Sequence, residues 1–227
     1  MVAARARVLS QPGVDALRQW IAEPQGTGFA SQPLPRRAGA LYAAALGSSQ
    51  LRDPQGARQA TVALQALVQG EPAAQRLAQL LAAEVELASG DEKAALQALQ
   101  ALPEGPDRRP ELVLRTQAGL RAKAPAPGLG DTPGALQTWL STHPRDATVW
   151  QLLASVWQAR GQPLRAVRAE AEAHAARYDY AAAVDRFKAG QDLARRGGAQ
   201  VDHIEASIID TRLRAVELLL REQAAER

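Results

Sequence analysis

One stretch of the sequence, residues 146–190, constrains the fold more than any other part of the chain. Its first half carries large and small apolar residues three, four and seven positions apart, a spacing that places side chains on one face of an α-helix. These residues are Trp150, Leu153, Ala154 and Trp157. Gly161 then breaks the helix, and Ala166 supplies a small side chain in the helix that follows. The spacing predicts two antiparallel helices that pack closely through small residues.

The same stretch is similar to the tetratricopeptide (TPR) repeat, a helical hairpin of roughly 34 residues. Ala154 and Trp157 stand where that repeat prefers Gly and Tyr, and Ala183 and Phe187 have the spacing of its second helix. Gly90 precedes Gly161 by about two repeat lengths. We therefore predict an all-α chain with a TPR-like α-α superhelix, a right-handed solenoid of about four imperfect helical hairpins.

The composition favours an all-helical chain. Hydrophobic residues make up 46% of the sequence but aromatic residues only 4%, so the apolar content is mostly Ala, Leu and Val. Ala and Leu favour helices, and the shortage of aromatic and β-branched residues argues against a large β-sheet core. The chain contains no cysteine, which excludes disulfides and cysteine-ligated metal and leaves the redox compartment open.

The net charge of +3 does not indicate nucleic-acid binding. A nucleic-acid binder concentrates its basic residues on one face, whereas the arginines of this chain form scattered pairs with acidic residues interleaved elsewhere. The pairs are Arg5/Arg7, Arg36/Arg37, Arg108/Arg109 and Arg195/Arg196. We interpret them as solvated surface charge and predict no nucleic-acid partner.

Glycine, proline and N-cap residues divide the chain into predicted helices. The helical ranges are 2–10, 12–22, 36–48, 54–69, 73–89, 91–102, 111–123, 131–140, 146–161, 163–177, a segment through Tyr180, Ala183 and Phe187, and 201–225. Asp53, Asp91 and Asp131 are predicted N-caps, and Gly90 is a predicted C-cap. Residues 23–35 and 124–130 are predicted loops, and Pro103 and Pro106 break the chain.

Two parts are expected along the chain. Residues 1–34 would form an N-terminal helical linker segment, and residues 35–227 a TPR-like helical repeat domain. The long last helix carries an apolar stripe and is predicted to cap the open end of the stack, as a terminal repeat must. No apolar run approaches the length of a transmembrane span, and the N-terminus lacks the hydrophobic segment of a signal peptide.

Residue types used in catalysis and metal binding form no recognisable motif. The sequence contains no His-Glu-x-x-His, no paired-cysteine site and no Gly-x-Ser-x-Gly. Its three histidines, His143, His174 and His203, are far apart in sequence. An isolated imidazole makes neither a metal site nor a catalytic pair. We predict a non-enzymatic chain without a metal or cofactor of its own.

The predicted binding surface is the inner, concave face of the superhelix, which is lined by the first helix of each hairpin. The candidate residues on three such helices are Leu77, Leu80, Glu84 and Leu87; Thr148, Gln151, Ser155 and Gln158; and Arg165, Arg168 and Glu172. Their mixture of polar and apolar side chains suits an extended peptide with alternating contacts. A clamp for a terminal carboxylate is disfavoured, because Arg165 and Arg168 lack the Asn partners of such a clamp.

Both ends of the chain resemble one family. The segment Ala4-Arg-Ala-Arg-Val-Leu-Ser-x-Pro12-Gly-Val-Asp-Ala-Leu17 resembles the segment that follows the catalytic domain in bacterial M48-type zinc metallopeptidases. The segment Arg177-Tyr-Asp-Tyr-Ala181-Ala-Ala183-Val-Asp-x-Phe187, together with residues 204–215, resembles the closing repeat and terminal helix of their C-terminal TPR regions.

This resemblance implies a periplasmic protein similar to the β-barrel assembly-enhancing protease. Its TPR region would dock onto outer-membrane barrel-assembly components or misassembled substrates, while a separate domain binds zinc and cleaves proteins. This sequence lacks the zinc-binding helix, so we expect a non-catalytic C-terminal fragment whose parent is a zinc-dependent metalloendopeptidase. The alternative is a free-standing TPR adaptor that binds peptide segments of a multiprotein assembly.

Overall fold

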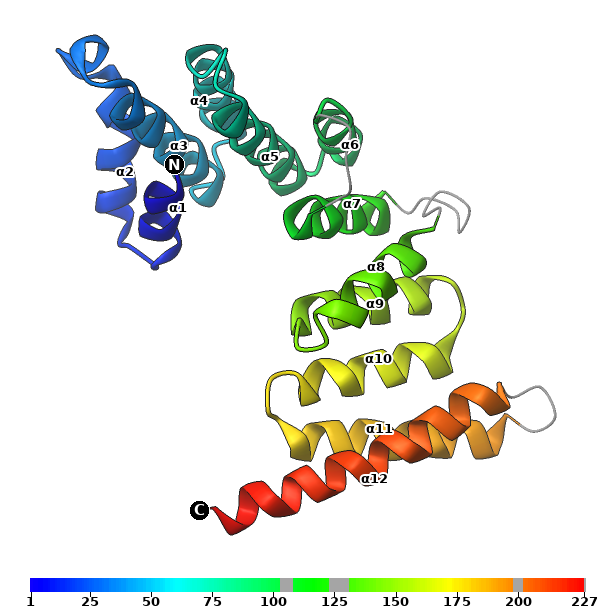
Figure 1. Ribbon diagram of the computed structural model, residues 1–227. Helices are drawn as coiled ribbons and strands as arrows, with labels where there is room; N and C mark the ends of the chain where they lie inside the picture. The colour runs from blue at the N-terminus through cyan, green and yellow to red at the C-terminus, as the bar shows by residue number, and fades with distance from the viewer. Residues whose placement is uncertain (103–107, 123–130, 198–201, 227) are drawn as a thin grey trace. The chain divides into compact units, whose positions relative to one another are not determined.

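The computed structural model describes residues 1–102, 108–122, 131–197 and 202–226, and within these ranges it contains helices and no strand (Figure 1). The α-helices are α1 (Val2–Leu9), α2 (Val14–Ala22), α3 (Leu34–Gln50), α4 (Pro54–Leu67), α5 (Pro72–Ser89), α6 (Glu92–Gln100), α7 (Arg109–Arg121), α8 (Thr132–Thr142), α9 (Ala147–Ala159), α10 (Pro163–Ala175), α11 (Tyr180–Arg196) and α12 (His203–Ala225). Two short 3-10 helices, η1 (Glu23–Gln25) and η2 (Phe29–Ser31), lie between α2 and α3. The predicted all-α class is confirmed.

The helix ends agree with most of the predicted caps. Asp53 and Asp91 accept hydrogen bonds from the amides of the third residue beyond them, whereas Asp131 makes no such side-chain bond. Helix α3 begins at Leu34, so Pro35 belongs to its first turn and not to the predicted loop, since proline is compatible with the first turn of a helix. The predicted loop at 124–130 and the breaks at Pro103 and Pro106 lie outside the described residues.

The chain divides into two compact units, unit 1 (Met1–Ala118) and unit 2 (Gly119–Arg227). In unit 1, α1 and α2 both pack against α3 and bury Ala4, Val8 and Leu17 in its core. Residues 1–34 are therefore an integral part of unit 1. This division departs from the predicted boundary at residues 34/35, because burial of these apolar side chains ties α1 and α2 to α3.

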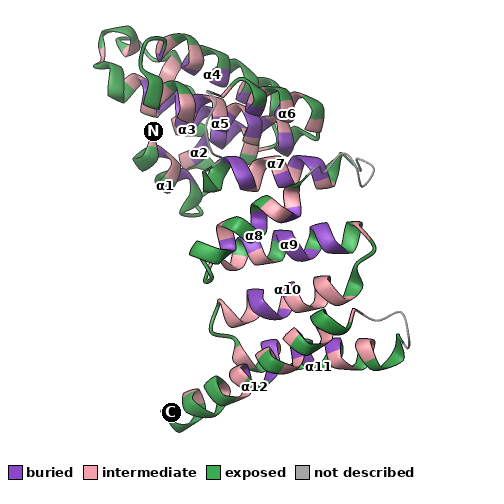
Figure 2. Ribbon diagram, turned by 45° about the vertical axis from the view of Figure 1, so that its right-hand side comes forward, coloured by how far each residue is buried: buried purple, intermediate pink, exposed green. Residues whose placement is uncertain are grey.

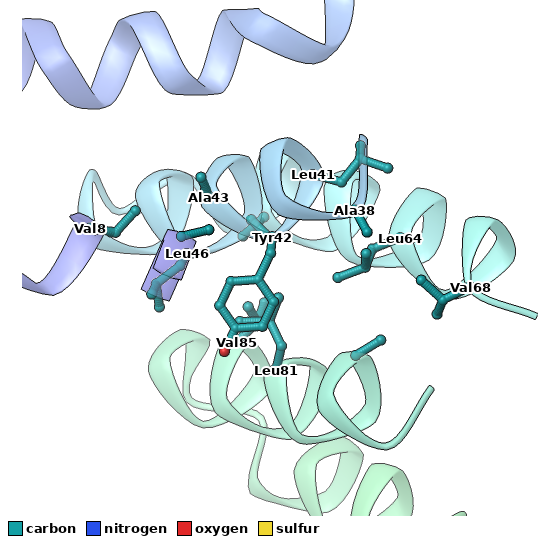
Figure 3. Close-up of a cluster of buried hydrophobic side chains, with 14 of the residues drawn as sticks. Val8, Ala38, Leu41, Tyr42, Ala43, Leu46, Leu64, Val68, Leu81 and Val85 are labelled. Atoms are coloured by element: carbon teal, nitrogen blue, oxygen red, sulfur yellow. The ribbon is translucent and has the colours of Figure 1, made fainter. Parts of the chain in front are cut away.

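Helix α3 is the central helix of unit 1. It contacts α1, α2, α4 and α5, and residues 40–48 are buried whichever way their side chains point. Figure 3 shows part of this cluster, with Leu41, Tyr42 and Leu46 labelled on α3. Most of residues 40–48 are Ala, Gly or Ser, whose small side chains allow neighbouring helices to approach. Leu64, Val68, Leu81 and Val85 complete the cluster from α4, the residue after it and α5.

Unit 2 is a succession of packed helices, with contacts between α8 and α9, α9 and α10, α10 and α11, and α11 and α12. Helix α12 also contacts α10, so three helices meet around one apolar cluster. A Cβ atom at Gly190 of α11 would lie 3.1 Å from Ile209 of α12 and 3.4 Å from Val167 of α10. A side chain at this position would require Ile209 to move by a few tenths of an ångström, whereas glycine fits between α10 and α12 without adjustment. Figure 2 shows the buried positions in purple.

Gly90, between α5 and α6, offers a simple test of how the turns are specified. Its φ is +82°, and no atom lies within 4 Å of where a Cβ would stand, so replacement by alanine adds backbone strain without a collision. We expect Gly90→Ala to lower the free energy of unfolding by roughly 1 kcal/mol in urea titrations. Gly39 is the matched control, since it lies within α3 without a positive φ and its Cβ would meet only the Met1 nitrogen at 3.9 Å, an ordinary contact. An equal loss in Gly39→Ala would contradict the explanation.

Candidate functional site

Helix α9 presents the predicted polar face to solvent. Thr148, Gln151, Ser155 and Gln158 are all exposed. The opposite face of the helix is buried through Val149, Leu153 and Val156, each with 0% exposure. The hydroxyl of Ser155 donates to the carbonyl of Gln151 at 3.1 Å, so the Thr148 hydroxyl and the two glutamine amides are the groups on this face that can both donate to and accept from a ligand.

The start of α9 is fixed by Asp146. One carboxylate oxygen accepts a hydrogen bond from the amide of Val149, and the other accepts one from the indole Nε1 of Trp139 at 3.0 Å. The indole of Trp150 donates to the carbonyl of Pro144 at 2.9 Å. The first turn of α9 is therefore held by hydrogen bonds to Trp139 of α8 and to Pro144 in the loop between α8 and α9.

The predicted hairpin-packing residues of unit 2 occupy the places that close packing requires. Leu153, Ala154, Trp157, Ala166, Ala183 and Phe187 are buried, and Trp150 is half-buried. Gly161 ends the turn after α9 with a φ of +66°. Ala154 and Ala166 are 2% and 1% exposed, so the small side chains of α9 and α10 are enclosed by neighbouring residues.

The predicted ligand-facing residues of α5 need correction. Leu80 packs against Leu99 of α6, and Leu87 packs against Ala95 of α6 and Ala118 of α7, so both leucines are core residues. Leu77 is half-buried. The remaining candidate, Glu84, is bound within the chain. These positions point toward neighbouring helices because α5 has helices packed on more than one side.

Glu84 of α5 pairs with Arg5 of α1. The Arg5 guanidinium donates to both carboxylate oxygens, at 2.5 and 3.1 Å, and also to the hydroxyl of Tyr42 on α3 at 3.2 Å. The Glu84 hydrogen bond raises the pKa of Arg5, whereas burial raises the pKa of the Tyr42 hydroxyl. Glu84, which was predicted to face a ligand, is therefore neutralised by Arg5 of the same chain.

The charged candidates of α10 are likewise engaged, by α12. Arg165 donates to Asp202 at 3.0 Å, and Glu172 receives a two-pronged hydrogen bond from Arg212 at 2.6 and 2.8 Å. Arg168 lies 2.5 Å from Glu205, and both side chains are largely buried. The prediction that these residues face a ligand therefore needs correction, since the three ion pairs hold the last helix against α10.

Two of these ion pairs shift the pKa of one of their members. The carboxylate of Asp202 accepts the amide of Glu205 and the guanidinium of Arg165, and these bonds lower the pKa of Asp202. The carboxylate of Glu172 raises the pKa of Arg212 by the same kind of bond. Both effects favour the charged forms of Asp202 and Arg212.

Unit 1 contains a groove that the sequence did not reveal. It lies between α4, α5 and the end of α6 and has a volume of about 570 Å³. Its lining residues are Val62, Gln65, Ala66, Gln69, Pro72, Gln75, Arg76, Gln79, Ala101 and Leu102. Four glutamines therefore alternate with small apolar groups. The glutamines lie on two separate helices, so the sequence alone does not show that they line one groove. That conclusion requires the packing of α4 on α5.

The floor of the groove is held by an amide chain. The side-chain amide of Gln65 donates to Gln79 at 2.9 Å, and the amide of Gln79 donates to the carbonyl of Ala98 in α6 at 2.8 Å. Arg76 forms an ion pair with the buried Glu111 of α7. These bonds occupy Gln65, Gln79 and Arg76, whereas Gln69 and Gln75 are exposed at the rim.

The three histidines have different surroundings. The ring of His143 stacks on Trp139 at 3.8 Å between centroids, and His174 lies 3.3 Å from the carboxylate of Asp179. His203 is exposed at the start of α12. Among the residues that the structure describes, no group of three or more His, Cys, Asp or Glu side chains could hold a metal ion.

Comparison with known proteins gives no assignment. No model of a known protein family matches the chain, and no curated protein sequence matches it. Within the described ranges, none of the helices combines the length and the apolar character needed to cross a membrane.

Proposed function

We propose that this chain is a non-catalytic protein-interaction domain of TPR-like helical hairpins, and that it binds an extended peptide segment in the groove of unit 1. The groove carries the proposal. Its apolar lining, with Val62, Ala66 and Leu102, can accept alternate side chains of a peptide. The exposed amides of Gln69 and Gln75 can both donate to and accept from a peptide backbone, so they recognise a strand-like ligand without requiring charge.

The TPR-like reading is supported by the packing in unit 2. Ala154, Ala166 and Ala183 are buried at the positions where adjacent helices of a hairpin repeat approach, and Gly161 turns the chain between α9 and α10. The exposed polar face of α9 is a second surface that such a repeat would offer to a protein.

The wider role in this proposal follows the resemblance at the two ends of the chain. The domain would belong to a periplasmic M48-type zinc metallopeptidase and would recruit substrates or outer-membrane assembly partners to it. Purified chain should then contain no stoichiometric zinc and leave casein intact. Zinc at one equivalent together with casein cleavage would refute the non-catalytic role.

Groove binding is tested by peptides selected from a random displayed library on the full chain. We expect Val62→Asp to weaken the selected peptides at least tenfold in fluorescence anisotropy, because a carboxylate would enter the apolar lining. Val62 is 63% exposed, so the fold tolerates the change, and Val2→Asp on α1, at 71% exposure, is the matched control.

A third variant locates the site if the groove is not used. Gln151→Arg alters the exposed face of α9 without touching the groove residues. Peptides weakened by Gln151→Arg and not by Val62→Asp would move the binding site to unit 2. If neither substitution weakens peptide binding, neither surface is the binding site.

A further inference from the structure

The outward face of α12 is apolar, although the last helix of a repeat stack normally turns a polar face to water. Side chains at 4-3-4-3 spacing run along it: Ile204, Ile208, Thr211, Ala215 and Leu218. Ile204 is 77% exposed and Leu218 is 51% exposed, with the neighbouring Leu219 also exposed. The opposite face, with Ile209, Leu213 and Val216, is the one that packs on α10 and α11.

This seam contains no unsatisfied polar group that would favour water. The hydroxyl of Thr211 donates to the carbonyl of Ser207 at 3.0 Å, and the remaining seam residues up to Leu218 are aliphatic. A 4-3 alternation of apolar residues is the pattern by which one helix packs along another. The seam therefore has the spacing to receive a second helix along four turns.

The charges of α12 are sorted between its two faces. Its acids from the N-cap to Glu217 turn to α10 and α11, where Asp202, Glu205, Asp210 and Glu217 meet Arg165, Arg168, Gln191 and Lys188. Arg214 and Arg221 are exposed beside the seam. Within the part of the chain that the structure describes, Arg214 makes no ion pair and Arg221 donates to the backbone carbonyl of Glu217. The outward surface over 204–221 therefore carries the apolar seam flanked by two arginines, and Glu222 follows at the next position of the seam.

We propose that the outward face of α12 is a docking site for an amphipathic helix of a partner protein whose apolar stripe is flanked by acidic residues. The apolar seam would pack against the stripe, and Arg214 and Arg221 would meet the acidic flank. This site shares no residue with the groove of unit 1, so it goes beyond the proposed peptide-binding function.

Two other occupants fit less well. In an antiparallel pair of two copies, the seam centred between Thr211 and Ala215 brings the two Arg214 side chains together, and in a parallel pair Glu222 meets Glu222. A membrane surface would be expected to meet aromatic residues and several basic ones, whereas this face has no aromatic residue and only two arginines.

The test uses the full chain and two synthetic helical peptides about three heptads long. Both carry Leu and Ile at the a and d positions; one has Glu at e and g, and the other has Lys there. We expect the Glu peptide to bind at least tenfold more tightly than the Lys peptide in isothermal titration. The double variant Arg214→Glu/Arg221→Glu should reverse this preference.

The seam is tested by Ile204→Gln and Leu218→Gln, each expected to weaken the Glu peptide at least tenfold. Val2→Gln, an equally exposed change in unit 1, and Val62→Asp in the groove should leave its affinity unchanged. Equal binding of the two peptides would overturn the proposal. A molecular mass in light scattering that corresponds to two chains, and that Leu218→Gln reduces to one, would instead assign the face to self-association. Sedimentation with phosphatidylserine vesicles without peptide binding would assign it to a membrane surface, and either result would overturn the proposal.

Discussion

Replacing Phe187 with alanine should lower the free energy of unfolding of unit 2 by roughly 3–5 kcal/mol. Phe187 is fully buried and lies in the cluster that joins α10, α11 and α12, with Ala171, Ile209 and Val216 among its members. The substitution removes the largest fully buried side chain of the described chain and leaves a cavity that these packed helices can close only in part.

Three of the four tryptophans, Trp139, Trp150 and Trp157, lie in unit 2, so urea unfolding followed by tryptophan fluorescence reports mainly on that unit. Amide hydrogen exchange should rise in α10, α11 and α12 together, since the lost contacts belong to all three helices. Leu218→Ala is the control on α12, where the side chain is 51% exposed and the loss should stay below about 0.5 kcal/mol. Equal losses in the two variants would show that the cluster does not stabilise the unit.

The part of the fold that could be predicted is the part set by local signals. The helix ends at Asp53, Asp91 and Gly90 follow from capping residues that act on their own neighbours. The buried positions of α9 and α11 follow from apolar spacing within one helix. For these elements the sequence contains the whole of the physical cause.

Helix α3 shows where that reasoning stops. Leu41, Tyr42, Ala45 and Leu46 lie on one side of the helix, yet alanine and serine on the other sides are buried as well. Alanine is compatible with both solvent and core, so an alanine-rich helix does not show how many neighbours surround it. For the same reason, the sequence did not predict that α1 and α2 pack on α3, or that the chain divides after Ala118.

The candidate site was harder to predict, because it depends on partners distant in sequence. Glu84 and Arg5 are separated by 79 positions, and Glu172 and Arg212 by 40. A charged residue at a ligand-facing position looks the same in the sequence whether it meets a ligand or another helix of the same chain. The exposed face of α9 could be predicted, because a helix with one strongly apolar face buries that face and leaves its polar face to solvent. That polar face consists of Thr148, Gln151, Ser155 and Gln158.

The pair of Glu172 and Arg212 leads to the second large effect. Glu172 is almost completely buried, whereas Arg212 is about half-buried, so the two members are not equivalent. Arg212→Met keeps the aliphatic stem but leaves the carboxylate without its cation in the interface. We expect this variant to lose about 3 kcal/mol of stability at pH 7, because an uncompensated buried charge is costly.

The loss in Arg212→Met should depend on pH. Without the arginine, the almost completely buried carboxylate has no cation in the interface, and burial penalises only the charged form of a carboxyl group. Acid that neutralises the carboxylate therefore relieves the penalty, so the variant is expected to recover stability relative to the parent protein as pH falls from 7 to 5. Urea titrations of both proteins at several pH values measure the difference, in which the titration of all other groups largely cancels.

The double variant Glu172→Leu/Arg212→Met separates the charge from the packing. It removes both ends of the pair and fills the site with apolar side chains, so its stability should lie within about 1 kcal/mol of the parent protein and show none of the added pH dependence. Glu172→Leu alone should cost less than Arg212→Met, because water can still reach the half-exposed guanidinium. A loss in Arg212→Met that is the same at pH 5 and pH 7 would mean that Glu172 finds water or another cation, and that the interface between α10 and α12 opens readily.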